Sequence, residues 1–185
     1  MSKRVAILQS NYIPWKGYFD IIGLVDEFII YDEVQYTKND WRNRNKIKTP
    51  TGIQWITIPV YQKNLKQKIS ETEVSSYTWG VKNWNSLKAN YGKATFFRDY
   101  SLILEDFYCT FRSRLLSDIN LALIKLIADQ LDIRTTITNS RDFTLNGDST
   151  EKLVDLCKQT GATQYLTGPN AKNYLRENLF KEEGI

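Results

Sequence analysis

The sequence contains no histidine, and only two cysteines occur among its 185 residues. The absence of histidine excludes the Ser-His-Asp and Cys-His nucleophile systems and most kinds of zinc site. Acid–base chemistry must therefore use Asp, Glu, Lys, Tyr or a group of the substrate itself. Cys109 and Cys157 lack Cys-x-x-Cys spacing, which argues against a disulfide framework and favours a reducing compartment. We therefore expect a cytoplasmic protein.

Long apolar runs and a strong net charge are also missing. No apolar stretch is long enough to span a bilayer, so we expect no membrane insertion. The N-terminus runs directly into a strand pattern, so no signal peptide is expected. The formal net charge is only +4, from 25 basic and 21 acidic residues. This weak bias permits an anionic small-molecule ligand, and without a recognition motif it does not predict a nucleic acid partner.

Aromatic side chains are abundant, at 13% of the residues. Trp and Tyr serve in cores, and they also stack on rings or sugars while donating a hydrogen bond. A chain of this length buries roughly 70% of its unfolded surface, so a core needs no disulfides or metal to hold it. The length predicts one α/β domain over residues 1–185.

The order of the expected elements predicts an α/β fold. Residues 5–8 and 28–31 are short apolar runs typical of strands buried on both faces, and residues 17–25 between them have helical spacing. Strand, helix and strand in this order form a parallel βαβ unit. Further along the chain we expect strands at 133–138 and 163–166, and helices from Asp148 or Ser149 to about 158 and from Asn170 to about 180. The whole pattern predicts a Rossmann-like layered parallel sheet.

The middle of the chain follows a different pattern. Residues 44–60 predict an inserted β-hairpin around the turn signal Pro50-Thr51-Gly52. Helices near 80–91, 99–114 and 118–131 are expected to form a helical middle segment over about 80–131. The chain stops where another strand would naturally begin, and a truncated C-terminus is one interpretation of this stop.

The densest polar cluster follows the first expected strand and opens the first helix. In an open α/β sheet, ligands bind at the carboxyl ends of strands, and the N–H groups of a helix start favour an anion. The candidate substrate-binding residues in this cluster are Gln9, Asn11, Tyr12, Trp15, Lys16 and Tyr18. By position alone, a ligand site and plain packing of the crossover are equally supported. Neither G-x-G-x-x-G nor the P-loop pattern occurs, so neither nucleotide fingerprint applies.

A second polar cluster follows the second expected strand. Asp32 stands at the strand end, where it can orient a ribose, an amine or a metal. Arg42 and Arg44 carry planar guanidinium groups that suit phosphate or carboxylate. Gln35 and Asn43 add neutral hydrogen-bonding groups. A solvated lead-in to the hairpin is the alternative interpretation, but two polar clusters at one sheet edge favour a site.

A third cluster follows the expected strand at 163–166. It contributes Thr167 and Asn170 as further candidate substrate-binding residues. Gly168 between them lets a ligand approach the backbone. Simple capping of the next helix by Thr167 or Asn170 is the stronger alternative for this cluster.

These motifs resemble the WbqC-like protein family. The resemblance rests on residues 7–20 (ILQSNYIPWKGYFD), 32–36 (DEVQY) and 41–47 (WRNRNKI), and it resumes at 58–60 and 165–168. It implies a bacterial or archaeal protein of surface-polysaccharide (O-antigen) biosynthesis. It also implies transfer of an amino acid, glycine in particular, onto an amino sugar. Members of the family usually extend further at the C-terminus.

The leading hypothesis is therefore an aminoacyl or acyl transferase that acts on a nucleotide-linked amino sugar. Arg42, Arg44 and Lys16 would hold phosphates or developing charge, and Asp32 would act as base or orient the amine. Tyr12 and Trp15 would supply a stacking wall. The expected partners are a nucleotide-sugar or an amino acid.

Two alternatives belong to other classes. One is a non-catalytic module that binds a nucleotide-sugar or glycan. The other is a HIGH-type nucleotidyltransferase-like enzyme that uses ATP and magnesium, although both histidines of that motif are missing. The sequence itself requires no cofactor, since Asp32 and Glu33 are too few ligands to define a magnesium site. Oligomeric state is left open.

Overall fold

The computed structural model describes residues 2–173 and 175–185, without the side chains of Asn170 and Lys172. The chain forms two compact units. The first unit comprises Met1–Ser10, Pro14–Glu33 and Lys125–Ile185, and the second comprises Asn11–Ile13 and Val34–Ile124. The interpretation of residues 1–185 as a single α/β domain stays a prediction.

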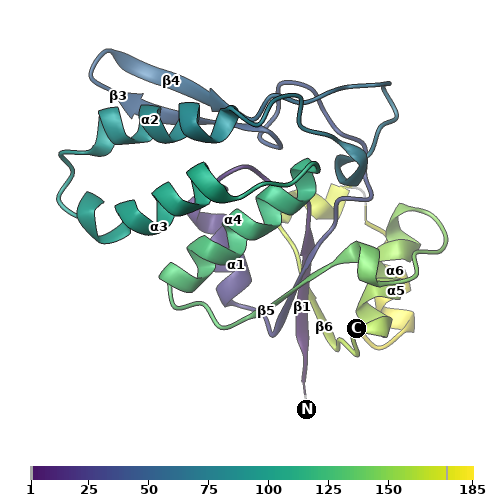
Figure 1. Ribbon diagram of the computed structural model, residues 1–185. Coiled ribbons are helices and arrows are strands. Elements are labelled where there is room, and N and C mark those ends of the chain that lie inside the picture. The colour runs from purple at the N-terminus through teal and green to yellow at the C-terminus, as the bar shows by residue number, and fades with distance from the viewer. Residues whose placement is uncertain (1, 174) are drawn as a thin grey trace. The chain divides into compact units, whose positions relative to one another are not determined.

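The first unit is built on a four-stranded sheet in the order β5-β2-β1-β6 (Figure 1). Its strands are β1 (Arg4–Leu8), β2 (Glu27–Ile30), β5 (Thr136–Asn139) and β6 (Gln164–Leu166), and all neighbouring pairs are parallel. The two central strands are buried, with Val5, Phe28 and Ile29 each 0% exposed. Their continuous apolar runs are typical of strands covered on both faces. The predicted layered parallel sheet is therefore confirmed.

Helices lie on both sides of this sheet. Figure 1 shows α1 (Lys16–Gly23) on one side, and α5 (Ser149–Gln159) and α6 (Glu177–Glu182) on the other. The strand order explains this arrangement, because right-handed crossovers that wind in opposite directions along a sheet place their helices on opposite faces. The start of α5 is capped by Asp148, whose Oδ1 accepts the N–H groups of Thr150 and Glu151.

Two expected elements have different bounds in the structure. The predicted helix from Asn170 to about 180 is wrong as one element, because a 3-10 helix η3 (Pro169–Asn173) precedes α6. Asparagine has a low helix propensity, and α6 is instead anchored by Phe180, which stacks on Tyr165 with ring centroids 5.0 Å apart. The strand expected from 133 begins only at Thr136, because Thr136 pairs with Glu27, the first residue of the neighbouring strand β2.

The second unit contains the hairpin and most of the helical segment. Strands β3 (Arg44–Thr49) and β4 (Gly52–Thr57) pair antiparallel. They are followed by the 3-10 helix η1 (Ile69–Glu71), α2 (Trp79–Tyr91), α3 (Phe97–Thr110) and the start of α4 (Leu116–Gln130), which ends in the first unit. The predicted inserted hairpin and helical middle segment are both present.

The core of the second unit is aromatic. Trp79, Trp84 and Tyr108 are at most 4% exposed, and Tyr12 contacts the edge of Trp79 with ring centroids 6.2 Å apart. The hydroxyls of Tyr12 and Tyr108 are 3.0 Å apart, and the side-chain amide of Asn83 donates to Tyr12 Oη. Buried tyrosine hydroxyls need such partners. The mid-chain aromatic side chains Trp79 and Trp84 are therefore core residues and not a sugar-stacking surface.

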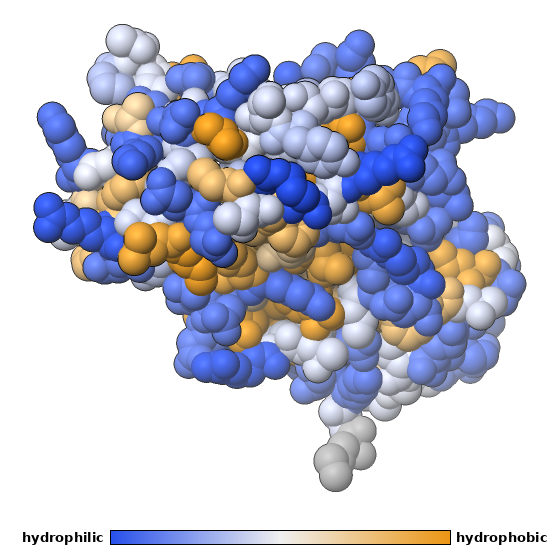
Figure 2. Space-filling model, viewed as in Figure 1, coloured by the Kyte–Doolittle hydropathy of each residue, from blue (hydrophilic) through white to orange (hydrophobic). Residues whose placement is uncertain are grey.

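On the face seen in Figure 2, hydrophilic side chains predominate, and a group of hydrophobic side chains gathers near the centre of the view. A singly exposed apolar residue such as Leu65 is normal on a protein surface, whereas Leu102 is exposed together with Ile103 and Tyr100 of α3. Among the residues that the structure describes, no helix has the length and apolar character needed to cross a lipid bilayer.

Candidate functional site

Polar residues follow the carboxyl ends of the parallel strands in the first unit. The register pairs Leu8 of β1 with Ile30 of β2, and Ile30 with Asn139 of β5, so these strands end at one level. The polar residues at this edge are Gln9 and Ser10 after β1, Asp32 after β2, Asn139 and Ser140 at the end of β5, and Thr167 after β6. This edge is where open α/β sheets bind ligands.

The strand order contains a switch point beside β1. The chain builds β1, β2 and β5 in one direction along the sheet and then returns to place β6 on the other side of β1. In doubly wound folds, a crevice forms at the point where the strand order reverses. The loops that flank this point begin at Gln9 after β1 and at Thr167 after β6.

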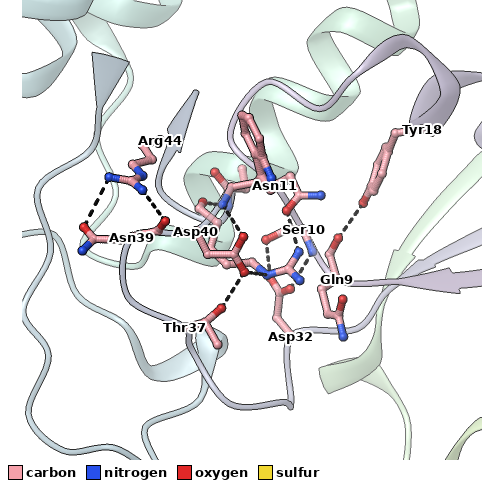
Figure 3. A network of polar contacts seen from close by, with 12 residues as sticks. Gln9, Ser10, Asn11, Tyr18, Asp32, Thr37, Asn39, Asp40 and Arg44 are labelled. Carbon is pink, nitrogen blue, oxygen red and sulfur yellow. Dashed lines mark hydrogen bonds and ion pairs between the residues drawn. The ribbon is translucent and has the colours of Figure 1, made fainter. Parts of the chain in front are cut away.

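Asp32 and Ser10 form a buried pair at this edge, and both are 0% exposed. The Ser10 N–H donates to Asp32 Oδ1 over 2.8 Å, and the Ser10 hydroxyl donates to Asp32 Oδ2 over 2.7 Å (Figure 3). Two hydrogen bonds to one carboxylate fix its orientation and join the ends of β1 and β2. A carboxylate has about four lone-pair sites, so these bonds leave acceptor capacity for other groups.

Two further polar groups at the end of β5 were not predicted from the sequence. Asn139 is 5% exposed and Ser140 is 0% exposed. Asn139 Oδ1 accepts the N–H of Arg141 over 3.0 Å, but within the described chain Asn139 Nδ2 and Ser140 Oγ have no hydrogen-bond partner. Leaving such a group unpaired costs about 1–3 kcal/mol, so each invites a ligand or water partner. The missed signal was the polar pair itself, directly after an expected strand.

The loop after β1 exposes one aromatic ring of the first unit. Trp15 is 59% exposed and packs edge-on against Tyr18, with ring centroids 5.6 Å apart. Gly17 makes room for this ring, since a Cβ at position 17 would lie 2.8 Å from Trp15 Nε1. Lys16 is exposed at the start of α1, whose first turn carries no acidic side chain. This end of α1 therefore combines positive charge with an aromatic face.

Tyr12 and Tyr18 require a correction to their predicted contact with substrate. Tyr12 is 0% exposed and Tyr18 is 1% exposed. Burial, together with neighbouring Tyr108, raises the pKa of Tyr12 well above its usual value, so its hydroxyl stays protonated. The hydroxyl of Tyr18 donates to the carbonyl of Gln9 over 3.0 Å. Both rings are enclosed by protein, so Tyr12 cannot form part of a stacking wall, and Tyr18 acts by holding the Gln9 loop.

Arg42 lies in the second unit and binds neighbouring polar groups there. Its Nη1 donates to Asn11 Oδ1 over 2.5 Å, and its Nε lies 3.8 Å from the carboxylate of Asp40. Burial of Asp40 opposes ionisation, but hydrogen bonds from the Thr37 hydroxyl and the Trp41 N–H, with Arg42 nearby, lower its pKa overall. Arg42 thus orients Asn11, another predicted substrate-binding residue.

Arg44 is held by a different set of contacts in the second unit. Both of its terminal nitrogens donate to Asn39, one to the backbone carbonyl and one to the side chain (Figure 3). Its guanidinium carbon also lies 4.1 Å above the ring of Trp55, in a cation–π contact. The charges of Arg42 and Arg44 both contribute to lowering the pKa of Asp40.

Two neutral candidates of the second unit have well-defined partners. Asn43 is 7% exposed, and its Nδ2 donates to the carbonyl of Ile58 over 2.9 Å, while its Oδ1 has no partner within the described chain. Gln35 is exposed, and its side-chain amide donates to the carbonyl of Leu65 over 2.6 Å. Gln35 therefore ties down a loop, whereas Asn43 presents an unsatisfied acceptor.

Comparison with known proteins identifies the lineage. The model of the WbqC-like protein family matches residues 9–185. The chain belongs to the WbqC-like family. The uncharacterized protein Rv1507c of Mycobacterium tuberculosis is 48% identical over 184 residues, which cover 99% of this chain and 80% of that protein. No solved structure matches the chain.

The remaining candidates of this WbqC-like chain lie after β6. Thr167 lines a cavity of about 280 Å³ with Gly168, Leu175 and Phe180. The side chain of Asn170 lies outside the described residues, so its predicted role stays a prediction. In the part of the chain that the structure describes, no three Cys, Asp or Glu side chains gather in a way that could hold a metal ion.

Proposed function

We propose that this WbqC-like chain is an enzyme of surface-polysaccharide biosynthesis that transfers an aminoacyl (glycyl) or acyl group to a nucleotide-linked amino sugar. The main support is the pair of unpaired, buried polar groups on Asn139 and Ser140 at the carboxyl edge of the sheet. A polar small molecule bound at this edge would supply their missing hydrogen bonds. Family membership supports the same class of function.

Amide formation sets the roles that the residues must fill. The amine nitrogen of the acceptor sugar attacks the acyl carbon, the bond to the leaving group breaks, and the amine proton passes to a base. Asp32 is the proposed base or amine orienter, since two hydrogen bonds from Ser10 fix the orientation of its carboxylate at the sheet edge. Arg42, Arg44 and Lys16 are the proposed phosphate-binding residues.

A second candidate function is a non-catalytic module that binds a nucleotide-sugar. The observation in its favour is that Asp32 is 0% exposed and that both of its oxygens accept hydrogen bonds from Ser10. A carboxylate in this setting can serve to join two strand ends without moving a proton. The two candidates differ in whether any group is transferred.

The sheet-edge site is tested with Ser140→Ala in a thermal-shift screen. The panel contains nucleotide-linked amino sugars, glycine and ATP, each with and without magnesium. Bound ligand raises Tm by mass action, by RT ln(1 + [L]/Kd) in free energy. Ser140→Ala removes an unpaired hydroxyl, so the free protein should keep or raise its Tm while the ligand-induced shift falls. Ser86→Ala, whose hydroxyl bonds only within α2, is the matched control. If the ligand-induced shift in Tm were the same in Ser140→Ala as in the wild type, the proposed ligand site at Ser140 would be wrong.

Transfer is tested with Asp32→Asn and a mass-spectrometric assay for the acylated sugar. We expect this variant to bind the sugar nucleotide and to lose at least about a hundredfold in rate, the usual contribution of a general base. If Asp32→Asn kept full activity, Asp32 would not be the base. Binding by the wild-type chain without any transfer would favour the binding module, and ATP-dependent release of pyrophosphate would favour a nucleotidyltransferase.

A further inference from the structure

The second unit contains a polar cavity that was not predicted from the sequence. Its volume is about 320 Å³, and it is lined by Tyr36, Lys38, Asn39, Asn43, Val60 and Gln62. All six residues belong to the second unit, and none lies at the edge of the four-stranded sheet. Typical ligand pockets span about 300–1,000 Å³, so this cavity is of a size for one sugar ring and not for a whole nucleotide-sugar.

Asn43 gives this cavity a defined hydrogen-bonding polarity. The Asn43 backbone carbonyl accepts the N–H of Ile58 over 2.7 Å, and Asn43 Nδ2 donates to the Ile58 carbonyl over 2.9 Å. A carbonyl can only accept, so this contact fixes which end of the amide is nitrogen. Asn43 Oδ1 is then the end that lacks a partner in the described chain. The partner that this buried oxygen can accept is an O–H or N–H donor.

Two further lining residues are held in place by the protein. Tyr36 is 3% exposed, and burial, followed by the charge of Asp40, raises its pKa, so its hydroxyl is neutral at pH 7. Asn39 has a positive φ of 62°, which asparagine tolerates better than most residues, and Arg44 binds both its carbonyl and its side chain. These groups are preorganised hydrogen-bonding partners.

The charge of the lining discriminates between classes of ligand. Lys38 is exposed and is the only charged residue among the six. Asp40 acts on Tyr36, but its carboxylate is held by the Thr37 hydroxyl and the Trp41 N–H. The one charge in the lining is therefore positive, and it attracts an anionic substituent. A ligand that has hydroxyl donors and a negative substituent fits better.

We propose that this cavity binds a hydroxyl-rich sugar ring that carries a phosphate, with a ring donor on Asn43 Oδ1 and the phosphate beside Lys38. The assignment rests on the proposed function, because it gives the phosphorylated sugar portion of the substrate a site of its own. Tyr36 and Gln62 complete the contacts to the ring. The phosphate can come from a free sugar phosphate or from a nucleotide diphosphate sugar, and the probes below separate these sources.

Isothermal titration with four probes tests the assignment. The probes are N-acetylglucosamine 1-phosphate, its UDP-linked form, N-acetylglucosamine and inorganic phosphate. We expect the sugar phosphate to bind more tightly than either the neutral sugar or inorganic phosphate. Lys38→Gln should weaken binding of the sugar phosphate by about tenfold, the value of one hydrogen bond to a charged group, and leave the neutral sugar unaffected. Gln62→Ala should weaken both sugars.

The controls separate this assignment from the proposed function. Lys66→Gln changes an exposed lysine outside the lining and should bind every probe as the wild type does. Three outcomes would each overturn the cavity assignment. The first is wild-type affinity in both Lys38→Gln and Gln62→Ala, and the second is no binding of any probe. The third is equal affinity for inorganic phosphate and the sugar phosphate. If Ser140→Ala alone weakens the UDP-linked sugar, the cavity assignment fails and the proposed function stands. Sugar phosphate binding that depends on Lys38, without transfer in the mass-spectrometric assay, supports the cavity and rejects the enzyme.

Discussion

Tyr12 and Trp15 stand three positions apart in one polar run, yet their environments are opposite. Tyr12 is 0% exposed and its hydroxyl is paired with Tyr108, whereas Trp15 is 59% exposed. Both are large aromatic residues that suit a core or a stacking surface, so their type alone does not separate the two uses. Only Trp15 has a ring face that a ligand can reach.

The two cysteines offer a prediction at the residue scale. Burial raises the pKa of the Cys157 thiol to about 12, and the residue is 0% exposed, whereas Cys109 is partly exposed. The thiolate is the reactive form, so iodoacetamide at pH 8 should label Cys109 in the native protein and leave Cys157 unmodified. Peptide mass spectrometry measures both sites, with a guanidinium-unfolded sample as the control. Equal labelling rates in the native protein would contradict the burial of Cys157.

At the scale of elements, close approach between helices depends on one glycine. A Cβ at Gly80 in α2 would lie 2.0 Å from the backbone carbonyl oxygen of Tyr108 in α3. Backbone atoms cannot move aside as a flexible side chain can. Helix propensity favours alanine over glycine by about 1 kcal/mol, so local preference and tertiary contact disagree at this position.

We expect the tertiary contact to decide the outcome of Gly80→Ala. The variant should lose about 1–3 kcal/mol in free energy of unfolding, as overpacked sites do. Gly23→Ala is the matched control, because its Cβ would meet only Ile133 Cγ1, at 3.9 Å, and a helical alanine there should be neutral or stabilising. Urea denaturation measures both variants. Equal stability changes in Gly80→Ala and Gly23→Ala would argue against the α2–α3 contact.

The cap of α5 gives a second prediction at this scale. Hydrogen bonds from the Glu151 and Thr150 N–H groups, with the ion pair to Arg176, lower the pKa of Asp148. A depressed pKa means that the stabilisation is present above the unfolded pKa and is lost as pH falls through the folded pKa. Asp148→Ala should therefore lower Tm at pH 7, and the difference from the wild type should shrink on acidification.

Asp148→Asn provides the control for this cap. Asparagine keeps a side-chain oxygen for the cap but not the charge, so its Tm at pH 7 should lie between those of the wild type and Asp148→Ala. Differential scanning calorimetry across the acidic range records all three proteins. A wild-type advantage that stayed constant down to the lowest pH would show that the carboxylate charge does not contribute.

At the scale of the whole molecule, the two units differ in how their backbones are protected. In the first unit, β1 and β2 each have hydrogen-bonded strands on both sides. Val5, Phe28 and Ile29 in these strands are fully buried. In the second unit, residues 61–66 are exposed and belong to no helix or strand. Backbone opening is therefore expected to vary widely along the chain.

Native-state hydrogen exchange measures this variation. The amides of β1 and β2 should exchange slowest, through openings that approach global unfolding of their unit, and those of the exposed residues 61–66 should exchange faster than these. Mass spectrometry of peptic fragments resolves both regions in one experiment. Comparable protection of the loop and the central strands would contradict the burial of β1 and β2.

Much of the fold could be predicted from local patterns. The apolar runs at β1 and β2, the turn at Pro50-Thr51-Gly52 and the cap at Asp148 each encode structure within a few residues. Element bounds were less predictable where a distant contact decides them. The start of β5 at Thr136 is set by its pairing with Glu27 of β2, a residue that lies more than one hundred positions earlier in the sequence.

The sequence by itself determined the parallel sheet and the polar character of its carboxyl edge, because strand burial and loop polarity are local properties. It also determined the family, through motifs that match over residues 9–185. Only the tertiary structure decided which polar groups lack partners. These groups are Asn139 Nδ2, Ser140 Oγ and Asn43 Oδ1. In the sequence, nothing distinguishes their residues from other asparagines and serines. A hydrogen bond depends on the positions of two groups that folding brings together, so its absence is visible only in three dimensions.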